Sequence, residues 1–557
     1  MQALVECVPN FSEGRNRTVI DAIAREIADT EGVKLLDVDP GADTNRTVVT
    51  FVGTPATVLE AAFRAIKRAA ELIDMRKHRG AHPRLGATDV CPFVPLSGCT
   101  MADCVALARQ LGARVGEELA IPVYLYEEAA TRPERRNLAD IRQGEYEGLP
   151  EKLKDPAWVP DFGPAVFNPK TGATVIGARE FLIAYNINLN TRDRRLAQEI
   201  ALNIRESGRL QRDAQGNILR DEHGNPVRKP GKFQAVKAVG WYIPEYKQAQ
   251  VSLNLVNYKV TPPHVVFDEV CREAELLGLR VTGSELVGLI PLQALLMAGR
   301  YYLEKQGKSP GLPEKDLVDI AVRSLGLNDI SPFAPEKKII EYQLGERRGP
   351  LVKMAVADFA DELSTDSPAP GGGSVAALAG ALAAGLAAMV ANLSVGKKGY
   401  ESVASELRDV ATKAQELKDA LLAAVDEDTR AFNRVMEAFA LPKKSEEQQA
   451  ARHEAIQEAT RLATQVPLHV MQHAVHTLEL AAVVAQKGLT SAVSDAGVAA
   501  IMAKAAAEGA ALNVRINVGS LADESFVATS KATAEDLLAR ARDLASSVVG
   551  MVESKLS

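Results

Sequence analysis

Short apolar, β-branched runs alternate with amphipathic stretches through the first part of this chain. ALVECVPN, VKLLDVDP and TNRTVVTFVG have the pattern of strands, and residues 15–29 and 55–72 repeat apolar positions at helical spacing. This βαββα order returns in FLIAYNINLN, residues 191–206, KAVGWYIPE, QAQVSLNLVNY and a helix from about residue 263. We therefore predict two related α/β subdomains, with mixed sheets of the split βαβ type covered by helices and a ligand crevice between the two halves.

The pattern changes near residue 345, where Pro, Gly and charged residues cluster in SPFAPEKKIIEYQLGERRGP. Beyond this segment the chain is rich in Ala and holds only five of the 27 aromatic residues, which is typical of helices. The predicted fold is an α+β N-terminal part of two βαββα-type subdomains, followed by an all-α helical-bundle domain. We place the subdomains at 1–181 and 182–330, a linker at 331–350 and the helical domain at 351–557.

One stretch of the helical part, VAALAGALAAGLAAMVANL at residues 375–393, has no charge and reaches the length of a membrane span. Its composition favours a different structure. Leu378, Leu382, Leu386 and Leu393 share one stripe, and the many Gly and Ala residues permit close helix packing. We therefore predict a buried bundle helix, with a membrane span as the alternative.

An eight-residue unit, RDxxGNxx, occurs twice in succession, at residues 212–219 and 220–227. Its Gly-Asn and Asn-Pro steps are typical of tight turns. The pattern predicts an exposed hairpin within residues 212–231, and the sequence assigns it no role.

Composition and charge exclude several classes of protein. A chain of 557 residues with 46% hydrophobic and 25% charged residues is an ordinary globular protein of several domains, so disordered and collagen-like classes are excluded. The formal charge of −7 argues against a surface devoted to nucleic acid or membrane. Five cysteines without a CxxC pair, and an N-terminus without a signal-peptide pattern, favour a reducing cytoplasm.

The densest polar cluster is MRKHRGAHPRLGATDVCPF at residues 75–93, where Gly and Pro predict a loop. It contains two histidines and four cations: His78, His82, Arg76, Lys77, Arg79 and Arg84. Cations suit an anionic substrate, and they disfavour the charged form of a histidine, which keeps a base available near neutral pH. A basic surface loop with solvated histidines is the alternative, and the pattern alone does not separate the two.

Polar residues also stand at element boundaries of the first part. Ser12 is predicted as the N-cap of the first helix, with Glu13 in its first turn. Asp37, Asp39 and Asp43 follow a strand, where they could position a proton-transferring histidine or simply form a turn.

Residues 161–177, DFGPAVFNPKTGATVIG, combine Gly and Pro with Phe162 and Phe167. Such a stretch lets the backbone approach a flat ligand closely, and the two rings could stack on that ligand. A plain linker between subdomains is the alternative.

In the helical part, SPAPGGGSVAAL at residues 367–378 places three glycines before a helix, an arrangement that attracts anions but lacks the lysine of a P-loop. Further on, Asp426 and Asp428 stand beside Arg430 in an otherwise apolar helix. A carboxylate buried there would have a raised pKa and could transfer a proton, whereas pairing with Arg430 would lower that pKa. A solvated acidic turn is the alternative.

His469, His473 and His476 share one helical face, which is geometrically able to hold a metal. No Cys or carboxylate completes a ligand set, so a packed or exposed histidine stripe is favoured and no metal site is predicted.

Many of these segments, taken in order, resemble one enzyme family. VECVPNFSEGRN, LLDVDPGADTNRTVVTFVG, HRGAHPRLGATDVCPFVPL, PVYLYEEAA, DFGPAVFNPKTGATVIGARE and FLIAYNIN resemble glutamate formimidoyltransferase. SPAPGGGSVAALAGALAAGLAAMV, AAVDEDTRAF, SDAGVAA and NVRINVGSLAD resemble the cyclodeaminase that is fused to it in formimidoyltransferase-cyclodeaminase. The resemblance covers essentially the whole chain.

The resemblance implies a bifunctional folate enzyme of histidine degradation. Such an enzyme moves the formimino group of N-formimino-L-glutamate to N5 of tetrahydrofolate. It then cyclises 5-formiminotetrahydrofolate to 5,10-methenyltetrahydrofolate with release of ammonia. Tetrahydrofolate, free or polyglutamylated, is substrate and one-carbon carrier, and no metal, nucleic acid or membrane span is implied. A cytoplasmic homo-oligomer assembled through the helical domain is expected.

The resemblance also implies roles for individual residues. His82 would be the acid/base group of the transfer, and Asp428 that of the cyclisation. The folate-contacting segment would be Gly163, Pro164, Ala165, Val166, Phe167, Asn168, Pro169, Lys170, Thr171 and Gly172.

Two alternatives concern the helical part. It could act as a methenyltetrahydrofolate cyclohydrolase, because relatives of this domain do so, or it could be a non-catalytic oligomerisation scaffold. The sequence specifies neither subunit number, polyglutamate preference nor channelling of the intermediate. The 212–231 insertion and the histidine stripe have no assigned place in the family.

Overall fold

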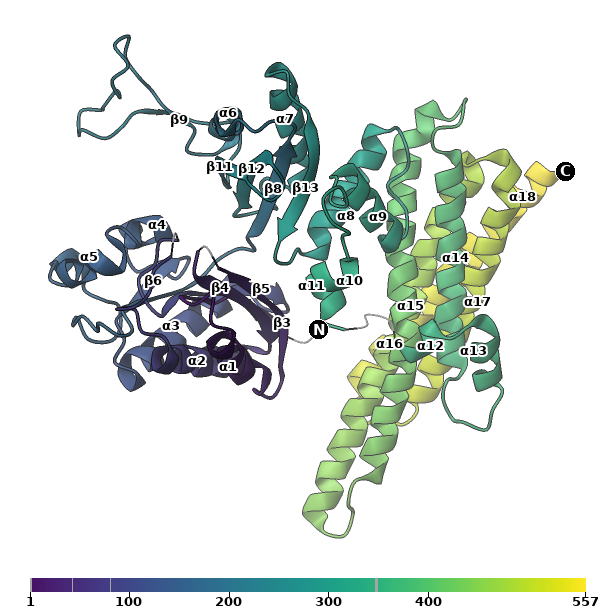
Figure 1. Cartoon of the computed structure of the whole chain (residues 1–557). Coiled ribbons are helices and arrows are strands. Elements are labelled where there is room, and N and C mark those ends of the chain that lie inside the picture. The colour runs from purple at the N-terminus through teal and green to yellow at the C-terminus, as the bar shows by residue number, and fades with distance from the viewer. Residues whose placement is uncertain (1–2, 43, 81, 346–348) are drawn as a thin grey trace. The chain divides into compact units, whose positions relative to one another are not determined.

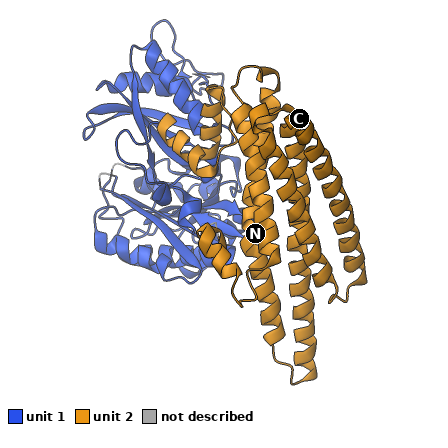
Figure 2. Cartoon of the chain, turned by 90° about the vertical axis from the view of Figure 1, so that its right-hand side faces the viewer, with its two compact units in different colours: residues 1–294, 325–345 blue, residues 295–324, 346–557 orange. Residues whose placement is uncertain are grey.

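The structure, a computed structural model, describes residues 3–42, 44–80, 82–345 and 349–557. It contains two compact units, Met1–Ala294 with Leu325–Gly345 and Leu295–Ser324 with Glu346–Ser557 (Figure 2). Sheets occur in the first unit, and long helices make up the second. The predicted fold class, α+β followed by all-α, is confirmed. The domain boundaries stay a prediction, and residues 295–324 group with the helical unit.

The first seven strands form one sheet, in the order β1-β4-β2-β5-β7-β6 with β3 paired to β4. Three helices pack on this sheet: α1 (Arg17–Ala28), α2 (Pro55–Leu72) and α3 (Met101–Glu118) (Figure 1). The short helices α4 (Leu138–Ile141) and α5 (Glu145–Lys152) follow β6. The strands are β1 (Leu4–Cys7), β2 (Asn10–Phe11), β3 (Val33–Gly41), β4 (Arg46–Gly53), β5 (Thr88–Ser97), β6 (Val123–Glu127) and β7 (Thr174–Ala178).

The second subdomain repeats this architecture. Its sheet has the order β11-β12-β8-β13, and helices α6 (Arg194–Ile204) and α7 (Pro263–Leu276) pack on it. Its strands are β8 (Ile183–Leu189), β11 (Val236–Ile243), β12 (Gln248–Leu255) and β13 (Val281–Val287). The first sheet contains the same succession, β3-β4-β1-β5, with all neighbours antiparallel in both. The relation predicted from element order therefore extends to strand order.

The first helix begins later than predicted. Its N-cap is Asn16, whose side chain accepts a hydrogen bond from the Thr18 amide. Ser12 instead donates from Oγ to the carbonyl of Gly86, 2.7 Å away. Glu13 forms a turn by accepting from the Arg15 and Asn16 amides. The N-cap prediction for Ser12 was wrong because a contact distant in sequence competes for the hydroxyl.

The repeated RDxxGNxx unit forms two successive tight turns between β9 (Arg209–Leu210) and β10 (Arg228–Lys229). In each copy the Asp carboxylate accepts from the Asn amide four residues later, and the Arg side chain donates to the Gly carbonyl. Gly216 and Gly224 have φ values of 87° and 78°, which glycine adopts without strain. Most residues of this segment are exposed, as predicted.

The remaining helices complete both units. Helices α10 (Pro335–Lys338) and α11 (Ile340–Gln343) end the first unit. In the helical unit, α9 (Glu314–Ser324) follows α8 (Leu292–Lys305), and both precede the bundle in the chain. The other helices are α12 (Pro350–Lys353), α13 (Val356–Leu363), α14 (Gly372–Ser394), α15 (Ala404–Ala440), α16 (Glu446–Lys487), α17 (Val493–Val518) and α18 (Glu524–Leu556).

Helix α14 packs against α15, α16 and α17 through small side chains. A Cβ at Gly380 would lie 3.0 Å from Leu421 and 3.4 Å from Ala506, so the two neighbouring helices approach closely there. This helix is long and apolar enough to cross a membrane, and 61% of its most apolar window is buried inside the chain. That burial favours the predicted bundle helix, because the core helix of a soluble protein meets the same length and composition criteria.

The segment between α8 and α9 is held on the bundle at Gly311. The Gly311 carbonyl accepts from Asn392 Nδ2 at 2.7 Å and from Gln415 Nε2 at 3.2 Å. A Cβ at Gly311 would lie 2.3 Å from that of Ala411, so only glycine permits this approach. The contact fixes residues 295–324 to α14 and α15.

Candidate active sites

The loop between α2 and β5, residues 73–87, carries the first candidate site. Its backbone is tied to neighbouring elements: Asn45 Nδ2 donates to the Arg79 carbonyl at 3.0 Å, and Ser12 holds Gly86. A Cβ at Gly80 would lie 2.2 Å from the Thr44 carbonyl oxygen, so glycine is required for this close approach. The loop is therefore held in place, as a site that positions a proton-transferring group requires.

His82 contacts Arg46 of β4, with 2.7 Å between Nε2 and the guanidinium. Because arginine remains protonated in proteins, it donates this hydrogen bond. His82 Nε2 is therefore the acceptor, the ring is neutral, and its proton is on Nδ1. Burial lowers the pKa of His82 to about 4, with the charges of Arg46 and Arg142 adding to the effect. Nδ1 is buried and has no partner among the residues that the structure describes.

Asp89 supplies the negative charge near His82. This carboxylate is fully buried on β5 and accepts from the Leu85 amide at 2.9 Å. It is also ion-paired with Arg142, which follows α4. The charge of Asp89 acts to raise the pKa of His82 against the two arginines. Sequence reasoning missed Arg46, Asp89 and Arg142, although a carboxylate inside the apolar strand sequence TDVCPFV was a usable signal.

His78 differs from His82. Its Nε2 lies 2.8 Å from the Asn45 carbonyl and donates to it, while Nδ1 accepts from Arg84 Nε at 3.2 Å. Arg84 is itself ion-paired with Glu145 and Glu147. His78 and Arg84 are therefore fully engaged in holding the loop.

The other charged residues predicted for this region also differ in their partners. Arg76 is paired with Asp74, 2.8 Å away, so neither Arg76 nor Arg84 is a free cation. Of the three strand-end aspartates, Asp39 contributes its charge to the surroundings of Arg46, and Asp37 interacts with the charge of Lys338. Asp43 lies outside the described residues.

The segment Gly163–Gly172 lies beside the His82 loop. The Lys170 carbonyl accepts from the Met75 amide and the Thr171 carbonyl from the Ala87 amide, at 2.9 and 2.8 Å. Asn168 Oδ1 accepts from the Lys170 and Thr171 amides and shapes the turn. The structure thus brings together two regions that the sequence singled out separately.

The first half of that segment is more open. Val166 is 67% exposed, and the Phe167 ring packs against Tyr146 at 5.4 Å between centroids. Phe162 instead covers Gly112 of α3, so of the two candidate stacking rings only Phe167 lies in this stretch. Residues 164–167 therefore offer accessible backbone and an aromatic ring to a flat ligand.

The second candidate site lies at the start of α14. Ser374 Oγ is 3.3 Å from Asp428 Oδ2 on α15 and donates also to the Val425 carbonyl. A Cβ at Gly373 would lie 2.0 Å from Asp428 Oδ1, so the glycine makes room for the carboxylate. Burial raises the pKa of Asp428, and the hydrogen bonds from the Ser374 side chain and backbone oppose that rise.

The two aspartates of the VDED sequence have different surroundings. Asp426 is 4% exposed and accepts from the Leu351 and Val352 amides, at 2.9 and 3.3 Å, so it caps α12. Arg430 pairs with Glu427 at 2.7 Å. Asp428 is therefore free of the arginine pairing considered in the sequence, which leaves burial as the dominant influence on its pKa.

The three histidines of the predicted stripe, His469, His473 and His476, all lie on α16. Burial lowers the pKa of His473, and the neighbouring charges of His469 and His476 add to this. Within the described part of the chain, no group of three His, Cys, Asp or Glu side chains is arranged to hold a metal.

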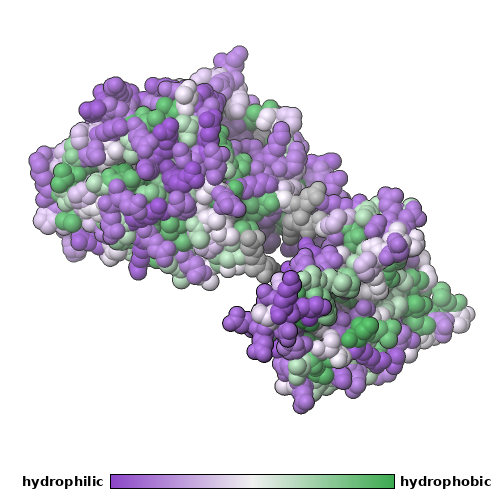
Figure 3. Space-filling model, turned by 90° about the horizontal axis from the view of Figure 1, so that it is seen from below, coloured by the Kyte–Doolittle hydropathy of each residue, from purple (hydrophilic) through white to green (hydrophobic). Residues whose placement is uncertain are grey.

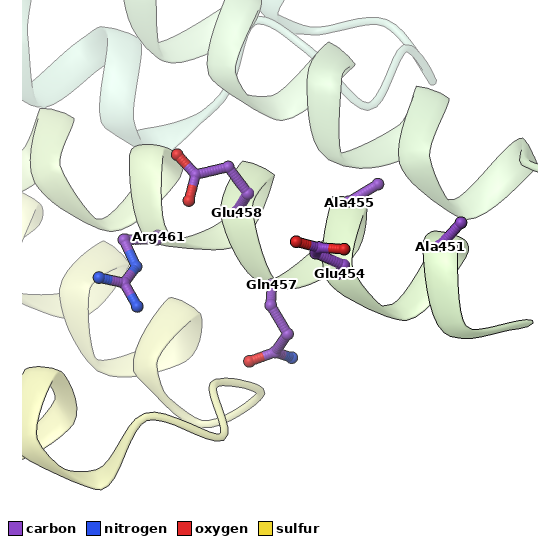
Figure 4. A pocket seen from close by; sticks show the side chains of 6 residues that line it. All are labelled: Ala451, Glu454, Ala455, Gln457, Glu458 and Arg461. Atoms are coloured by element: carbon purple, nitrogen blue, oxygen red, sulfur yellow. The ribbon is translucent and has the colours of Figure 1, made fainter.

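A hollow of about 630 Å³ opens on α16, lined by Glu454, Gln457, Glu458 and Arg461 together with two alanines (Figure 4). Arg461 is engaged by Asp523 at 2.8 Å, and Gln457 contacts the backbone of Ser520 and Ala522. Neither His82 nor Asp428 lines this hollow, so it is separate from both candidate sites.

Comparison with known proteins joins the two sites in one family. The chain is 46% identical to formimidoyltransferase-cyclodeaminase from Gallus gallus over 557 residues, covering 100% of both chains. The chain belongs to the formimidoyltransferase-cyclodeaminase family. Family models match consecutively: the formiminotransferase domain, N-terminal subdomain, at 4–179, the formiminotransferase domain at 184–345, and formiminotransferase-cyclodeaminase at 355–536. The resemblance stated from the sequence is confirmed.

Each of the two parts of this chain is also similar to a separate protein. Glutamate formimidoyltransferase from Thermoplasma acidophilum is 47% identical over 311 residues, which is 56% of this chain and 95% of that protein. Methenyltetrahydrofolate cyclohydrolase from Methylorubrum extorquens is 41% identical over 202 residues, 36% of this chain and 97% of that protein.

Proposed function

We propose that this chain transfers the formimino group of N-formimino-L-glutamate to N5 of tetrahydrofolate and then cyclises the product to 5,10-methenyltetrahydrofolate, a sequence that belongs to histidine degradation. The full-length identity to formimidoyltransferase-cyclodeaminase carries this proposal. His82 and Asp428 are the acid/base groups of the two steps. Tetrahydrofolate is substrate and carrier, and neither step requires a metal.

In the transfer, N5 attacks the amidine carbon and must lose its proton, while the departing glutamate nitrogen must gain one. One group can do both in turn. His82 is neutral in the described structure, so once Nε2 is free it can accept the proton from N5 and pass it to the leaving nitrogen. The segment Gly163–Gly172, hydrogen-bonded to the same loop, contacts the folate.

In the cyclisation, N10 attacks the formimino carbon and loses a proton, and the nitrogen that leaves as ammonia gains one. Asp428 suits this exchange, because a carboxylate whose pKa is raised by burial both accepts and returns a proton more readily near neutral pH. Ser374 orients the carboxylate by its two hydrogen bonds.

A second candidate function of the helical part is hydrolysis of methenyltetrahydrofolate. The identity to the Methylorubrum extorquens cyclohydrolase over nearly all of that protein's length supports it. In this case water takes the place of N10 as the attacking group, and no ammonia is produced.

We further propose a cytoplasmic homo-oligomer assembled through the helical domain. Apolar side chains on α14 and α17 support it, because Leu382, Leu512 and Ile516 are 53%, 65% and 75% exposed. Apolar residues are visible among polar ones on the surface in Figure 3. Exposed apolar side chains on neighbouring helices are typical of protein–protein contacts.

A time course with N-formimino-L-glutamate and tetrahydrofolate tests the proposed function. It follows 5-formiminotetrahydrofolate, 5,10-methenyltetrahydrofolate and ammonia in the wild type and in the His82→Ala and Asp428→Ala variants. We expect His82→Ala to block both products and Asp428→Ala to accumulate the formimino intermediate. If the wild type itself stalls at the intermediate, the helical part is a cyclohydrolase or a scaffold. An assay of methenyltetrahydrofolate hydrolysis then distinguishes the two, because only the cyclohydrolase catalyses it.

A further inference from the structure

Arg46 lies at the first site without a carboxylate of its own. Its guanidinium is largely buried, which lowers its pKa, and its close contact is His82 Nε2. Among the residues whose positions are described, no carboxylate forms an ion pair with it: Asp89 is ion-paired with Arg142, and Asp89 and Asp39 act on Arg46 only through their charges. A buried cation normally has an anionic partner.

The other arginine–histidine contact of this loop provides an internal comparison. Arg84 also donates to a histidine, His78, but it holds Glu145 and Glu147 at the same time. Arg46 has the histidine contact without the carboxylates. Because Arg46 lacks the ion pairs that Arg84 makes, its guanidinium can still bind an anion.

The contact has a consequence for proton transfer. His82 can accept a proton only at Nε2, because Nδ1 already carries the hydrogen, and Nε2 is occupied by the Arg46 hydrogen bond. The charged groups around the ring are Arg46 from β4, Arg142 beyond α4 and Asp89 from β5. Arg46 must therefore move from Nε2 before His82 can act as a base.

We propose that Arg46 is a positioning residue that holds His82 until a carboxylate of N-formimino-L-glutamate replaces the histidine as its partner. The substrate's carboxylate draws the guanidinium away and frees Nε2, which then takes the proton of N5 and delivers it to the departing glutamate nitrogen. Binding of the donor substrate thereby activates the base. The inference rests on the proposed transferase function and adds its recognition of an anionic donor.

Steady-state kinetics of the full-length protein test it with Arg46→Met, Arg46→Lys and the exposed control Arg25→Met. We expect Arg46→Met to raise KM for N-formimino-L-glutamate by about 10-fold or more and KM for tetrahydrofolate by less than about twofold, because only the donor loses an ion pair. Arg46→Lys keeps the charge and should recover part of the loss. Arg25→Met should behave as the wild type.

The pH profiles provide a readout that general damage to the fold does not produce. In the wild type the acidic limb of kcat should lie at higher pH than that of kcat/KM, because substrate removes the Arg46 charge from His82. In Arg46→Met the limb of kcat/KM should move upward. Ammonia production from added 5-formiminotetrahydrofolate in the same variant shows that the helical unit is folded, and an unchanged KM for tetrahydrofolate shows the same for the first unit.

Calorimetry of the wild type with L-glutamate tests the same exchange without a variant. Heats of binding near pH 5 in buffers of different ionisation enthalpy should show uptake of a fraction of a proton, which His82→Gln should abolish. Unchanged donor KM, coincident pH limbs and no proton uptake would overturn the role of Arg46 while the transferase stands. A wild type without transferase turnover would instead overturn the proposed function.

Discussion

His78 and His82 show how four positions of separation produce opposite chemistry. His78 donates from Nε2 to a carbonyl, whereas His82 accepts at Nε2 from Arg46. The sequence could mark both as candidates but not separate them, because the deciding partners come from a distant segment: Arg46 begins β4, and Asn45 lies in the turn before it. The same applies to Asp426 and Asp428, which the structure divides into a helix cap and a carboxylate with a raised pKa.

Glu6 is a further buried acid, and its effect falls on stability. It lies on β1 and is 1% exposed, and burial raises its pKa to about 8. A carboxyl whose pKa is raised by folding contributes stability below its unfolded pKa and loses that contribution as pH rises through the folded value. We expect Glu6→Gln to gain stability relative to the wild type between about pH 4.5 and 8, by up to about tenfold per pH unit in the unfolding equilibrium.

The measurement is the denaturant midpoint at pH 5, 7 and 9, followed by tryptophan fluorescence, since Trp158 and Trp241 both belong to the first unit. Exposed Glu117→Gln is the control. A difference between Glu6→Gln and wild type that does not grow with pH would show that Glu6 is ionised in the folded chain.

Helices and strands were largely predictable, because apolar periodicity is set locally. Residues 55–72 form α2 with the predicted bounds, and the expected strands are present. What the pattern could not provide was the helix start displaced from Ser12 to Asn16, since that depends on the Gly86 carbonyl. It also could not show that Met75 and Ala87 would bind the Gly163–Gly172 segment, a contact between distant parts of the chain.

Two glycines of α14 should respond oppositely to alanine. Gly373→Ala places a Cβ against the Asp428 carboxylate, and we expect loss of cyclisation by about 10²-fold or more with the transfer unchanged. Gly385→Ala meets no atom within 4 Å and should stabilise the helix by about 0.5–1 kcal/mol. The measurements are the rate of ammonia release and the midpoint of thermal unfolding of the helices. If the two variants changed these quantities equally, the assigned geometry would be contradicted.

The paired turns of the RDxxGNxx segment should be dispensable. Leu210 pairs with Arg228, so residues 211–227 can be replaced by a two-residue Asn-Gly hairpin. We expect both activities to stay within about twofold, because each turn is stabilised by its own Asp and Arg. A selective rise in KM for either substrate would instead assign the segment to binding.

The two compact units are not separated at a single point of the chain. Residues 295–324 belong to the helical unit although they precede the linker, and Gly311 holds them there. Cleavage at a protease site engineered at 346–349 should therefore leave two fragments that co-elute in size-exclusion chromatography. Gly311→Leu should release them, because its side chain would meet Ala411. Separation of the unmodified fragments would contradict this anchoring.

The two sheets of the first unit share one strand order but differ in one connection. Between α2 and β5 the chain runs through residues 73–87, whereas between α7 and β13 it needs only 277–280. The loop that carries His82 is thus present in one half of the first unit, and its counterpart in the other half is a short turn. Protein engineers can treat the short 277–280 turn as an insertion site where a longer loop leaves every strand with its neighbours, and a copy of the His82 site there would also need counterparts of Arg46, Asp89 and Arg142.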